Sequence, residues 1–510
     1  MAEEETKLWW FAVQSRFVLF CMQFTFNICV PDHHPDVFNP PITDKDSWNF
    51  VDRAVNVLLC GFIRWDGVYF LHIAEHGYTY ENCLAFFPLY PMLIRFLSNS
   101  VFFPLQFVMT YRSVLMMSAV ILNQILFMKT VMIMYRFGRN ILNCDLLAYK
   151  AALLFCINPA SIFMAAPYSE ILFSYLIFSG MHMFERNFTI SASILFGLSA
   201  LARSNGLLYF GLILHKKCKD IIHLLKLLNP TARADNWSIP TAVWSMLWII
   251  LLPVIIYLML CASPFFLYQY LAYKWFCTET PSDIHTLIFE YGMSQGYRLK
   301  AYNSTVWCSD SIPLPYSYIQ KNHWNVGFMT YYQLKQIPNF LLAAPVTLLS
   351  VSAIICYIRE NWKTVRTLDL IEYFEESKKT DEVEQDEGVF KNRKLLPYIA
   401  HLVFLTVFGW LFIHIQVLTR MLFSSSPVLY WFTAKVITKD TTNKLKFNKW
   451  DVLRNYKRNN IPVLDNSDRN ILVDQILSSR LDFKSKLVFV YFLGYFVVGT
   501  FLFSNFLPWT

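Results

Sequence analysis

Long apolar stretches alternate with shorter polar segments along the whole chain. The apolar stretches approach or exceed the roughly 20 residues that a helix needs to cross a bilayer, so the pattern predicts an all-α integral membrane protein. The first stretch, from Leu8 to Val30, is too long for the core of a signal peptide, and we expect it to be retained as a span. The expected spans are 8–30, 107–137, 147–166, 169–185, 190–214, 241–271, 338–358, 397–418 and 486–506.

Four polar segments lie between these spans, and basic residues indicate their orientation. Arg136 and Arg139 place the segment near residue 140 in the cytosol, and the basic cluster at 215–226 does the same for the next one, because cytosolic segments are enriched in Lys and Arg. Counting spans then places 31–106, 272–337 and the polar 434–485 in the lumen and the charged 359–396 in the cytosol.

The region 147–214 conflicts with this count. Three full spans would begin in the cytosol and end in the lumen, whereas the basic cluster at 215–226 places their end in the cytosol. We therefore expect one broken or re-entrant helix, and Asn158-Pro159 together with 166–170 supplies the break. Irregular backbone at membrane depth is tolerated only where protein or a wet cavity covers it, so this region is a candidate cavity wall.

Composition supports the membrane assignment and narrows the chemistry. Of the 510 residues, 55% are apolar and only 16% are charged, whereas a soluble domain carries about 25% charged residues. The net charge of +8 does not indicate a nucleic-acid partner, because the basic residues lie mainly between spans. The 11 cysteines are scattered without a CxxC pair, so we expect no metal site.

Two features of 272–337 depend on its side of the membrane. In an oxidising lumen, Cys277 and Cys308 are predicted to form a disulfide, and two free buried thiols are the alternative. A lumenal Asn303 is also a usable glycosylation acceptor, whereas the sequons at Asn187 and Asn236 fall on or near the cytosolic side.

The most informative polar cluster is Arg64, Asp66, Glu75 and His76, expected in the lumen just above the membrane. Sugar transfer from a lipid phosphate needs a base that takes the proton of the acceptor hydroxyl, but no strong acid, because the phosphate leaves as a stable anion. A glycosidase would need two carboxylates. Asp66 is the candidate base, and a helix cap or an ion-pair partner is the structural alternative.

Five further residues are candidate ligands of a lipid phosphate or partners of such ligands. Arg203 lies within an expected span, where a buried charge is costly; it either binds the phosphate or pairs with Glu170 as a structural tie. Lys335, beside Gln336 at the mouth of the next helix, either meets the phosphate or snorkels to lipid headgroups. Arg420, just past a span, is a second phosphate candidate.

Several sequence blocks together resemble the PIG-V family of mannosyltransferases, which act in glycosylphosphatidylinositol-anchor assembly. The blocks appear in family order and cover most of the chain. They are RWDGVYFLHIAEHGY (64–78), AFFPLYP (85–91), NPASIFMAAPYSE (158–170), LARSNGL (201–207), WNVGFMTYYQLKQIPNFLLAAP (324–345), QVLTR (416–420) and NFLPWT (505–510).

The resemblance implies a single polytopic domain, 1–510, of the GT-C type, a helical bundle whose lumenal loops form the active site in the endoplasmic reticulum membrane. It implies transfer of the second, α1,6-linked mannose from dolichyl-phosphate-mannose to the glycolipid precursor, with inversion, no cofactor and no metal. Asp66 maps onto the acidic position of the first lumenal loop, and Arg64, Trp65, Glu75 and His76 accompany it as site-shaping residues. A small accessory membrane subunit is a further conceivable partner.

Three other functions remain open from the residues alone. A transporter or scramblase for a lipid-linked sugar would suit broken helices and an intramembrane arginine, but it would gather its polar residues at mid-membrane between repeats, and the chain has no internal repeat. An accessory subunit would need no acid at Asp66. Another dolichol-linked mannosyltransferase is the alternative within the same enzyme class.

Overall fold

The computed structural model describes residues 2–33, 37–227, 247–279, 284–302, 305–370, 389–438 and 483–509. These residues are mainly helical, and their only β-pairing is an isolated bridge between Tyr80 and Leu299. The longer helices are α1 (Ala2–Cys29), α5 (Tyr111–Leu142), α9 (Phe210–Leu227), α11 (Leu252–Tyr273), α14 (Ile337–Glu360), α16 (Leu396–Phe412) and α20 (Phe483–Ser504). The shorter ones are α2 (Phe50–Leu59), α3 (Asp66–His76), α4 (Leu89–Asn99), α6 (Asp145–Cys156), α7 (Glu170–Glu185), α8 (Thr189–Ala202), α12 (Thr286–Ser294), α13 (Pro315–Asn322), α15 (Trp362–Thr367), α17 (Leu418–Ser425) and the helix Val428–Thr438.

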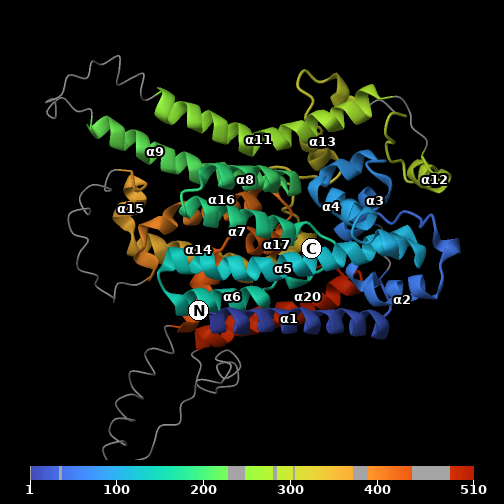
Figure 1. Ribbon diagram of the computed structural model, residues 1–510, viewed down its shortest axis with the longest axis horizontal. Coiled ribbons are helices and arrows are strands. Elements are labelled where there is room, and N and C mark those ends of the chain that lie inside the picture. Colours follow the sequence, from blue (N-terminus) through green and yellow to red (C-terminus); the bar gives the residue numbers. More distant parts are fainter. Residues whose placement is uncertain are drawn as a thin grey trace, which may run out of the picture.

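The long helices run side by side, and α5 lies in the middle against α6 and α7 (Figure 1). Helices α2, α3, α4 and α12 gather at one end of this bundle, and α15 lies at the other (Figure 1). We call these the Asp66 end and the opposite end.

Five helices of the described residues are long and apolar enough to cross a membrane. They match five expected spans, which confirms an all-α polytopic membrane protein. They are Tyr111–Leu142, Leu252–Thr278, Leu334–Glu360, Arg393–Phe412 and Phe483–Ser504. The expected span 8–30 is the continuous helix α1, which is not among the five, and 241–246 lie outside the described residues.

The expected spans 147–166, 169–185 and 190–214 are wrong as full spans. Their helices α6, α7 and α8 have 12, 16 and 14 residues, fewer than the roughly 20 that cross a bilayer. The predicted break is confirmed, since Cys156 ends α6 and Glu170 begins α7. A second break was not predicted: α8 ends at Ala202, because Arg203 takes an extended conformation.

Helices α6 and α7 form one pair, and α8 and α9 form a second. In each pair the chain starts from the opposite end of the bundle and returns to it. Asp145, the first residue of α6, pairs with Arg139 at 2.7 Å, and the end of α7 meets α9 where Lys216 Nζ donates to Asn187 Oδ1 at 2.7 Å. The chain therefore enters the bundle twice between α6 and α9 and returns to the same end both times. Residues 147 and 215–226 then lie at the same end, which removes the conflict in the span count.

The polar segment 434–485 begins on the side opposite to the one expected. Lys435 Nζ lies 2.6 Å from Glu360 Oε1 at the end of α14, and the ring of Phe432 contacts Phe390 at 5.8 Å between centroids. This beginning therefore lies beside 359–396, so the expectation that the two segments lie on opposite sides of the membrane is wrong for it. The count of spans failed because α17 and Val428–Thr438, which are separated by a break at Ser426-Pro427, lead the chain back to the end where α14 finishes. Residues 371–388 and 439–482 lie outside the described residues.

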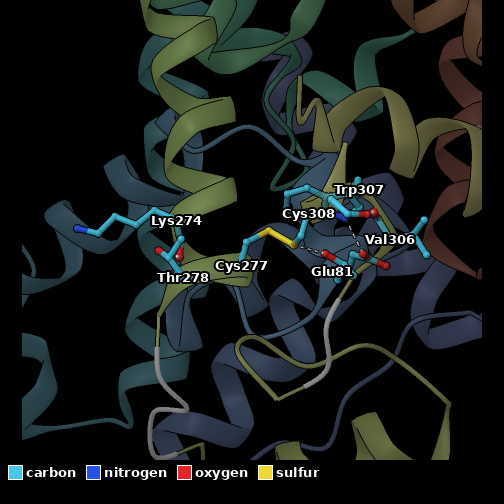
Figure 2. Close-up of a disulfide and its surroundings, with 9 residues drawn as sticks. Glu81, Lys274, Cys277, Thr278, Val306, Trp307 and Cys308 are labelled. Carbon is cyan, nitrogen blue, oxygen red and sulfur yellow. Dashed lines mark hydrogen bonds between the residues drawn. A yellow bond between two sulfur atoms is a disulfide. The ribbon is translucent and has the colours of Figure 1, made fainter. Parts of the chain in front are cut away.

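The predicted disulfide between Cys277 and Cys308 is confirmed (Figure 2). It ties the end of α11 to the segment before α13, with 5.7 Å between the two Cα atoms. The sequons at Asn303 and Asn236 lie outside the described residues.

A buried arginine in α1 stabilises the broken end of α6. Arg16 is 6% exposed and donates to Cys156 O at 2.8 Å and to Ser161 O at 3.2 Å. The last carbonyl groups of a helix have no partner within it, and in the membrane water does not supply one. Arg16 therefore donates hydrogen bonds to carbonyl groups that would otherwise have no partner at the break.

Replacing Arg16 by leucine is expected to lower the free energy of unfolding by about 3 kcal/mol, because it removes charged hydrogen bonds and leaves buried carbonyl oxygens unpaired. The measurement is thermal unfolding of the protein in detergent. Arg136→Leu is the matched control, since its pair with Glu5 is 55% exposed on the arginine side and is worth at most about 1 kcal/mol. Equal losses in the two variants would contradict this role for Arg16.

Candidate active site

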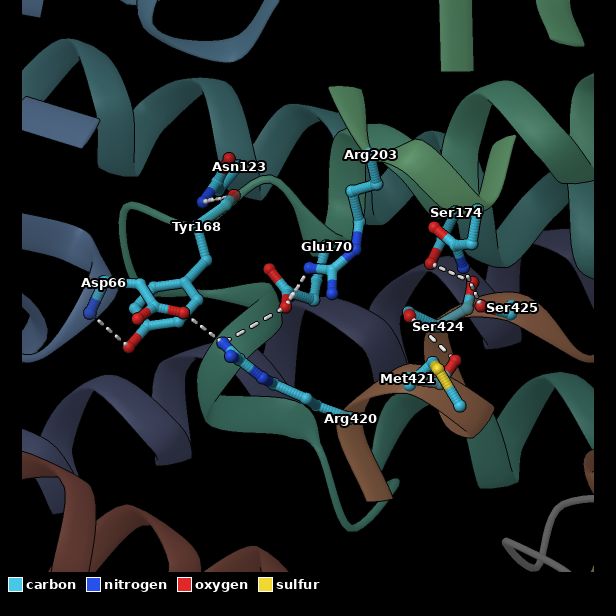
Figure 3. A network of polar contacts seen from close by, with 11 residues as sticks. Asp66, Asn123, Tyr168, Glu170, Ser174, Arg203, Arg420, Met421, Ser424 and Ser425 are labelled. Atoms are coloured by element: carbon cyan, nitrogen blue, oxygen red, sulfur yellow. Dashed lines mark hydrogen bonds and ion pairs between the residues drawn. The ribbon is translucent and has the colours of Figure 1, made fainter. Parts of the chain in front are cut away.

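Four charged residues meet inside the bundle where helices begin or end (Figure 3). Asp66 is the first residue of α3 and Glu170 is the first residue of α7, so each carboxylate lies at a helix N-terminus, where the helix dipole favours negative charge. Arg203 directly follows α8, and Arg420 is the third residue of α17. We call these four residues the charged network.

Arg420 is the centre of the charged network. Its Nη1 lies 2.6 Å from Asp66 Oδ2 and 3.5 Å from Glu170 Oε1, and Glu170 Oε1 also pairs with Arg203 Nη1 (Figure 3). Two acids and two arginines balance, as a buried network requires. The Glu170 side chain is fully buried, whereas the Asp66 side chain is 26% exposed.

The irregular segment between α6 and α7 forms the wall behind Arg420. The guanidinium carbon lies 5.4 Å from the ring centroid of Phe163 and 5.5 Å from that of Tyr168, a contact that favours a cation. The Tyr168 hydroxyl also accepts a hydrogen bond from the Asp66 backbone N–H at 3.0 Å and lies 3.3 Å from Arg64 O. The Tyr168 side chain thus contacts both the turn before α3 and the guanidinium of Arg420.

Trp65 lies in a strained turn directly before Asp66. Its φ of 52° is in the left-handed region, which a bulky residue adopts only when its surroundings impose it. Arg64 anchors the turn: its Nη2 pairs with Asp32 at 2.9 Å, its Nε donates to Ser504 O at 3.0 Å, and its guanidinium lies over the Phe506 ring. Arg64 and the C-terminal block therefore fix the start of α3.

Glu75 and His76 lie at the far end of α3, about 15 Å along the helix from Asp66. Glu75 Oε2 pairs with Arg112 at 2.6 Å, and His76 Nε2 lies 3.6 Å from the same oxygen. Burial raises the pKa of Glu75 although Arg112 opposes the shift, and burial lowers the pKa of His76 to about 4. The structure does not bring these two predicted residues into the charged network.

Lys335 and Gln336 precede α14 and also lie apart from the charged network. Lys335 is exposed. Gln336 Oε1 accepts from Asn339 Nδ2 at 2.6 Å, the same amide donates to Tyr331 at 2.8 Å, and Tyr331 donates to Gln416 at 3.1 Å. This chain of hydrogen bonds connects Gln336 to the residues directly before α17.

Another buried acid, Glu81, lies outside the charged network and was not predicted. Its Oε1 accepts from Trp307 Nε1 at 2.8 Å, next to the disulfide (Figure 2), and its Oε2 lies 3.2 Å from His323 Nε2. The partners are 226 and 242 positions away in the sequence. A single acid in an aromatic segment carries no local signal for such contacts.

The chain matches known proteins over almost its whole length. The family described as Mannosyltransferase (PIG-V) matches residues 4–510. The chain is 38% identical to the mouse GPI alpha-1,6-mannosyltransferase 2 and 36% identical to the human one, in both cases over 98% of this chain and 97% of the relative. It is 30% identical to the Drosophila melanogaster GPI mannosyltransferase 2 over the full length of both chains. No solved structure gives a significant match.

All four residues of the charged network lie within the matched range 4–510. A family of mannosyltransferases that covers almost the whole chain fits neither a transporter nor an accessory subunit. The protein is therefore a membrane enzyme, and the chain belongs to the PIG-V family of mannosyltransferases.

Proposed function

We propose that the protein transfers the second mannose, in α1,6 linkage, from dolichyl-phosphate-mannose to the glycosylphosphatidylinositol precursor, at the lumenal face of the endoplasmic reticulum membrane. The names of the relatives support the acceptor and the linkage. The observation that carries the proposal is the charged network, in which a partly open carboxylate, Asp66, contacts a buried arginine at 2.6 Å.

A lumenal position for the Asp66 end is supported from both ends of the bundle. The opposite end carries basic residues, including Arg136, Arg139 and Lys216, which favour the cytosol. The Asp66 end carries the disulfide between Cys277 and Cys308, which favours an oxidising compartment.

In this proposal the reaction is a single displacement with inversion. The acceptor hydroxyl oxygen attacks the anomeric carbon of mannose and forms the new C–O bond. The bond from that carbon to the phosphate oxygen breaks, and its electron pair leaves with dolichyl phosphate. Asp66 takes the proton of the hydroxyl, which is general base catalysis by one carboxylate.

Arg420 and Arg203 are the proposed partners of the donor phosphate. The phosphate gains negative charge as its bond to the sugar breaks, so a fixed cation stabilises the transition state more than the bound donor. The Arg203 side chain is 20% exposed, and Arg420 Nε has no hydrogen-bond partner among the described residues, so both have donors to offer.

The test is expression of the chain in cells that lack their own second mannosyltransferase. We expect the accumulated one-mannose glycolipid to be converted to a two-mannose glycolipid, whose outer sugar is released by an α1,6-specific mannosidase, and surface GPI-anchored proteins to return. Persistent one-mannose glycolipid in cells that contain the protein, or an outer sugar that resists this mannosidase, would refute the proposal.

A further inference from the structure

A wall of aromatic side chains lies one helical turn from Asp66. Tyr69 is three residues further along α3 and therefore lies on the same side of the helix. Its ring stacks on Phe86 with 4.4 Å between centroids, and Trp324 lies 6.2 Å from Tyr69 and 5.9 Å from Phe86. All three rings are only partly buried. We call Tyr69, Phe86 and Trp324 the aromatic wall.

Two rings of the aromatic wall are fixed from behind. The other face of Tyr69 stacks on Phe38 at 4.0 Å. The backbone carbonyl of Phe86 accepts hydrogen bonds from the hydroxyls of Tyr78 at 2.7 Å and Tyr268 at 3.3 Å. These contacts make one side of the aromatic wall rigid before any ligand arrives.

Trp324 comes from a distant segment and is positioned by Glu81. The neighbouring His323 contacts Glu81 Oε2, whose side chain is 2% exposed. The other oxygen of Glu81 accepts from Trp307, and Trp307 precedes Cys308 of the disulfide (Figure 2). The disulfide, Trp307, Glu81 and His323 thus form one connected support behind Trp324.

One buried polar atom beside the aromatic wall, the side-chain oxygen of Asn82, lacks a hydrogen-bond partner among the described residues. Asn82 is 4% exposed and donates through Nδ2 to the Tyr69 hydroxyl at 3.3 Å. Its Oδ1 is buried and has no hydrogen-bond partner within the described ranges. A buried acceptor without a donor is costly, and a sugar hydroxyl is a donor that would satisfy it. Aromatic surfaces with a few polar groups are typical of small-molecule sites.

We propose that the aromatic wall and Asn82 form the subsite for the acceptor sugar, the mannose of the one-mannose glycolipid, and that Glu81 is a positioning residue acting through His323 on Trp324. This rests on the proposed function, because it names where its acceptor binds. Phe38 and Phe86 cover the two faces of Tyr69, so it is the partly exposed ring of Trp324 that covers the apolar face of the sugar. Asn82 Oδ1 accepts a hydrogen bond from one of the sugar hydroxyls. Asp66, on the same side of α3, then receives the proton of the reacting hydroxyl.

The test compares Trp324→Ala, Trp324→Phe and the matched control Trp410→Ala in microsomes from cells that lack the endogenous enzyme. Trp410 is also half-buried and contacts another aromatic ring, Phe340, at 5.5 Å between centroids. Initial rates are measured against a synthetic one-mannose glycosylphosphatidylinositol at saturating dolichyl-phosphate-mannose, and then with the roles of the two substrates exchanged.

We expect Trp324→Ala to raise the KM for the acceptor by about two- to tenfold, the range that one aromatic contact is worth. The KM for the donor should stay within about twofold, and the acceptor KM of Trp324→Phe and of Trp410→Ala should stay near the wild-type value. Glu81→Gln, which keeps hydrogen-bonding groups beside Trp307 and His323, should raise the acceptor KM less than Glu81→Ala, with kcat little changed.

A rise in the donor KM alone, or an unchanged acceptor KM in Trp324→Ala, would overturn the subsite. If the alanine variant does not accumulate, Trp324→Leu replaces it, since leucine fills part of the space without a ring. Failure of the proposed function is distinguishable, because the wild-type chain would then form no two-mannose product in the same microsomes.

Discussion

Replacing Asp66 by asparagine is expected to lower kcat by a factor of about 10² to 10⁴ while the protein accumulates normally. That range is what a positioned general base contributes. Asparagine has nearly the same size and keeps an oxygen that can accept the hydrogen bond which Arg420 now makes to Oδ2 at 2.6 Å. It cannot take the proton of the acceptor hydroxyl. The measurement is conversion of the one-mannose to the two-mannose glycolipid, normalised to protein abundance.

The control for this experiment is Asp310→Asn, an identical change at an exposed aspartate near the same end of the bundle. We expect it to keep full activity. Normal activity of Asp66→Asn would contradict the assignment of Asp66 as the general base. Asp66 would then serve only as the ion-pair partner of Arg420. Glu170, the other carboxylate of the charged network, would become the next candidate base.

The sequence predicted the long spans well, because their signal is local. Length and apolar content suffice to identify a helix such as α5, whose 32 residues exceed the requirement for crossing a bilayer. The short helices were read as full spans, because their breaks depend on distant partners. Arg16 supports the break after α6 from about 140 positions away, and no local pattern in either segment encodes that contact.

The candidate site shows the same division. Each member of the charged network could be chosen from a local argument, either an acid near the membrane surface or a charge within an apolar stretch. The pairing of these residues could not be predicted from the sequence, because Arg420 and Asp66 are 354 positions apart in the chain. Glu75 and His76 were chosen because they are close to Asp66 in sequence, but α3 carries them to its far end. For Arg203 the structure shows the pair with Glu170, while its side chain stays 20% exposed, so phosphate binding by Arg203 stays a proposal.

Arg420 is the residue whose removal should have the second largest effect. In Arg420→Met the fully buried Glu170 keeps only Arg203, and Asp66 loses its partner. Breaking a buried ion pair from one side costs about 3–5 kcal/mol, so we expect a lower melting temperature in detergent and lower abundance. Activity per molecule should fall by a factor of about 10² to 10³, the usual cost of removing one stabilising donor from a transition state.

The double variant Asp66→Asn/Arg420→Met separates these two effects. It removes one negative and one positive charge together, so the remaining pair of Glu170 and Arg203 stays balanced. We expect its melting temperature to return toward that of the wild type, whereas activity stays lost. A double variant as unstable as Arg420→Met would show that charge balance does not explain the stability of the network. A stable, fully active Arg420→Met would remove Arg420 from the proposed phosphate site and leave Arg203 as its remaining cation.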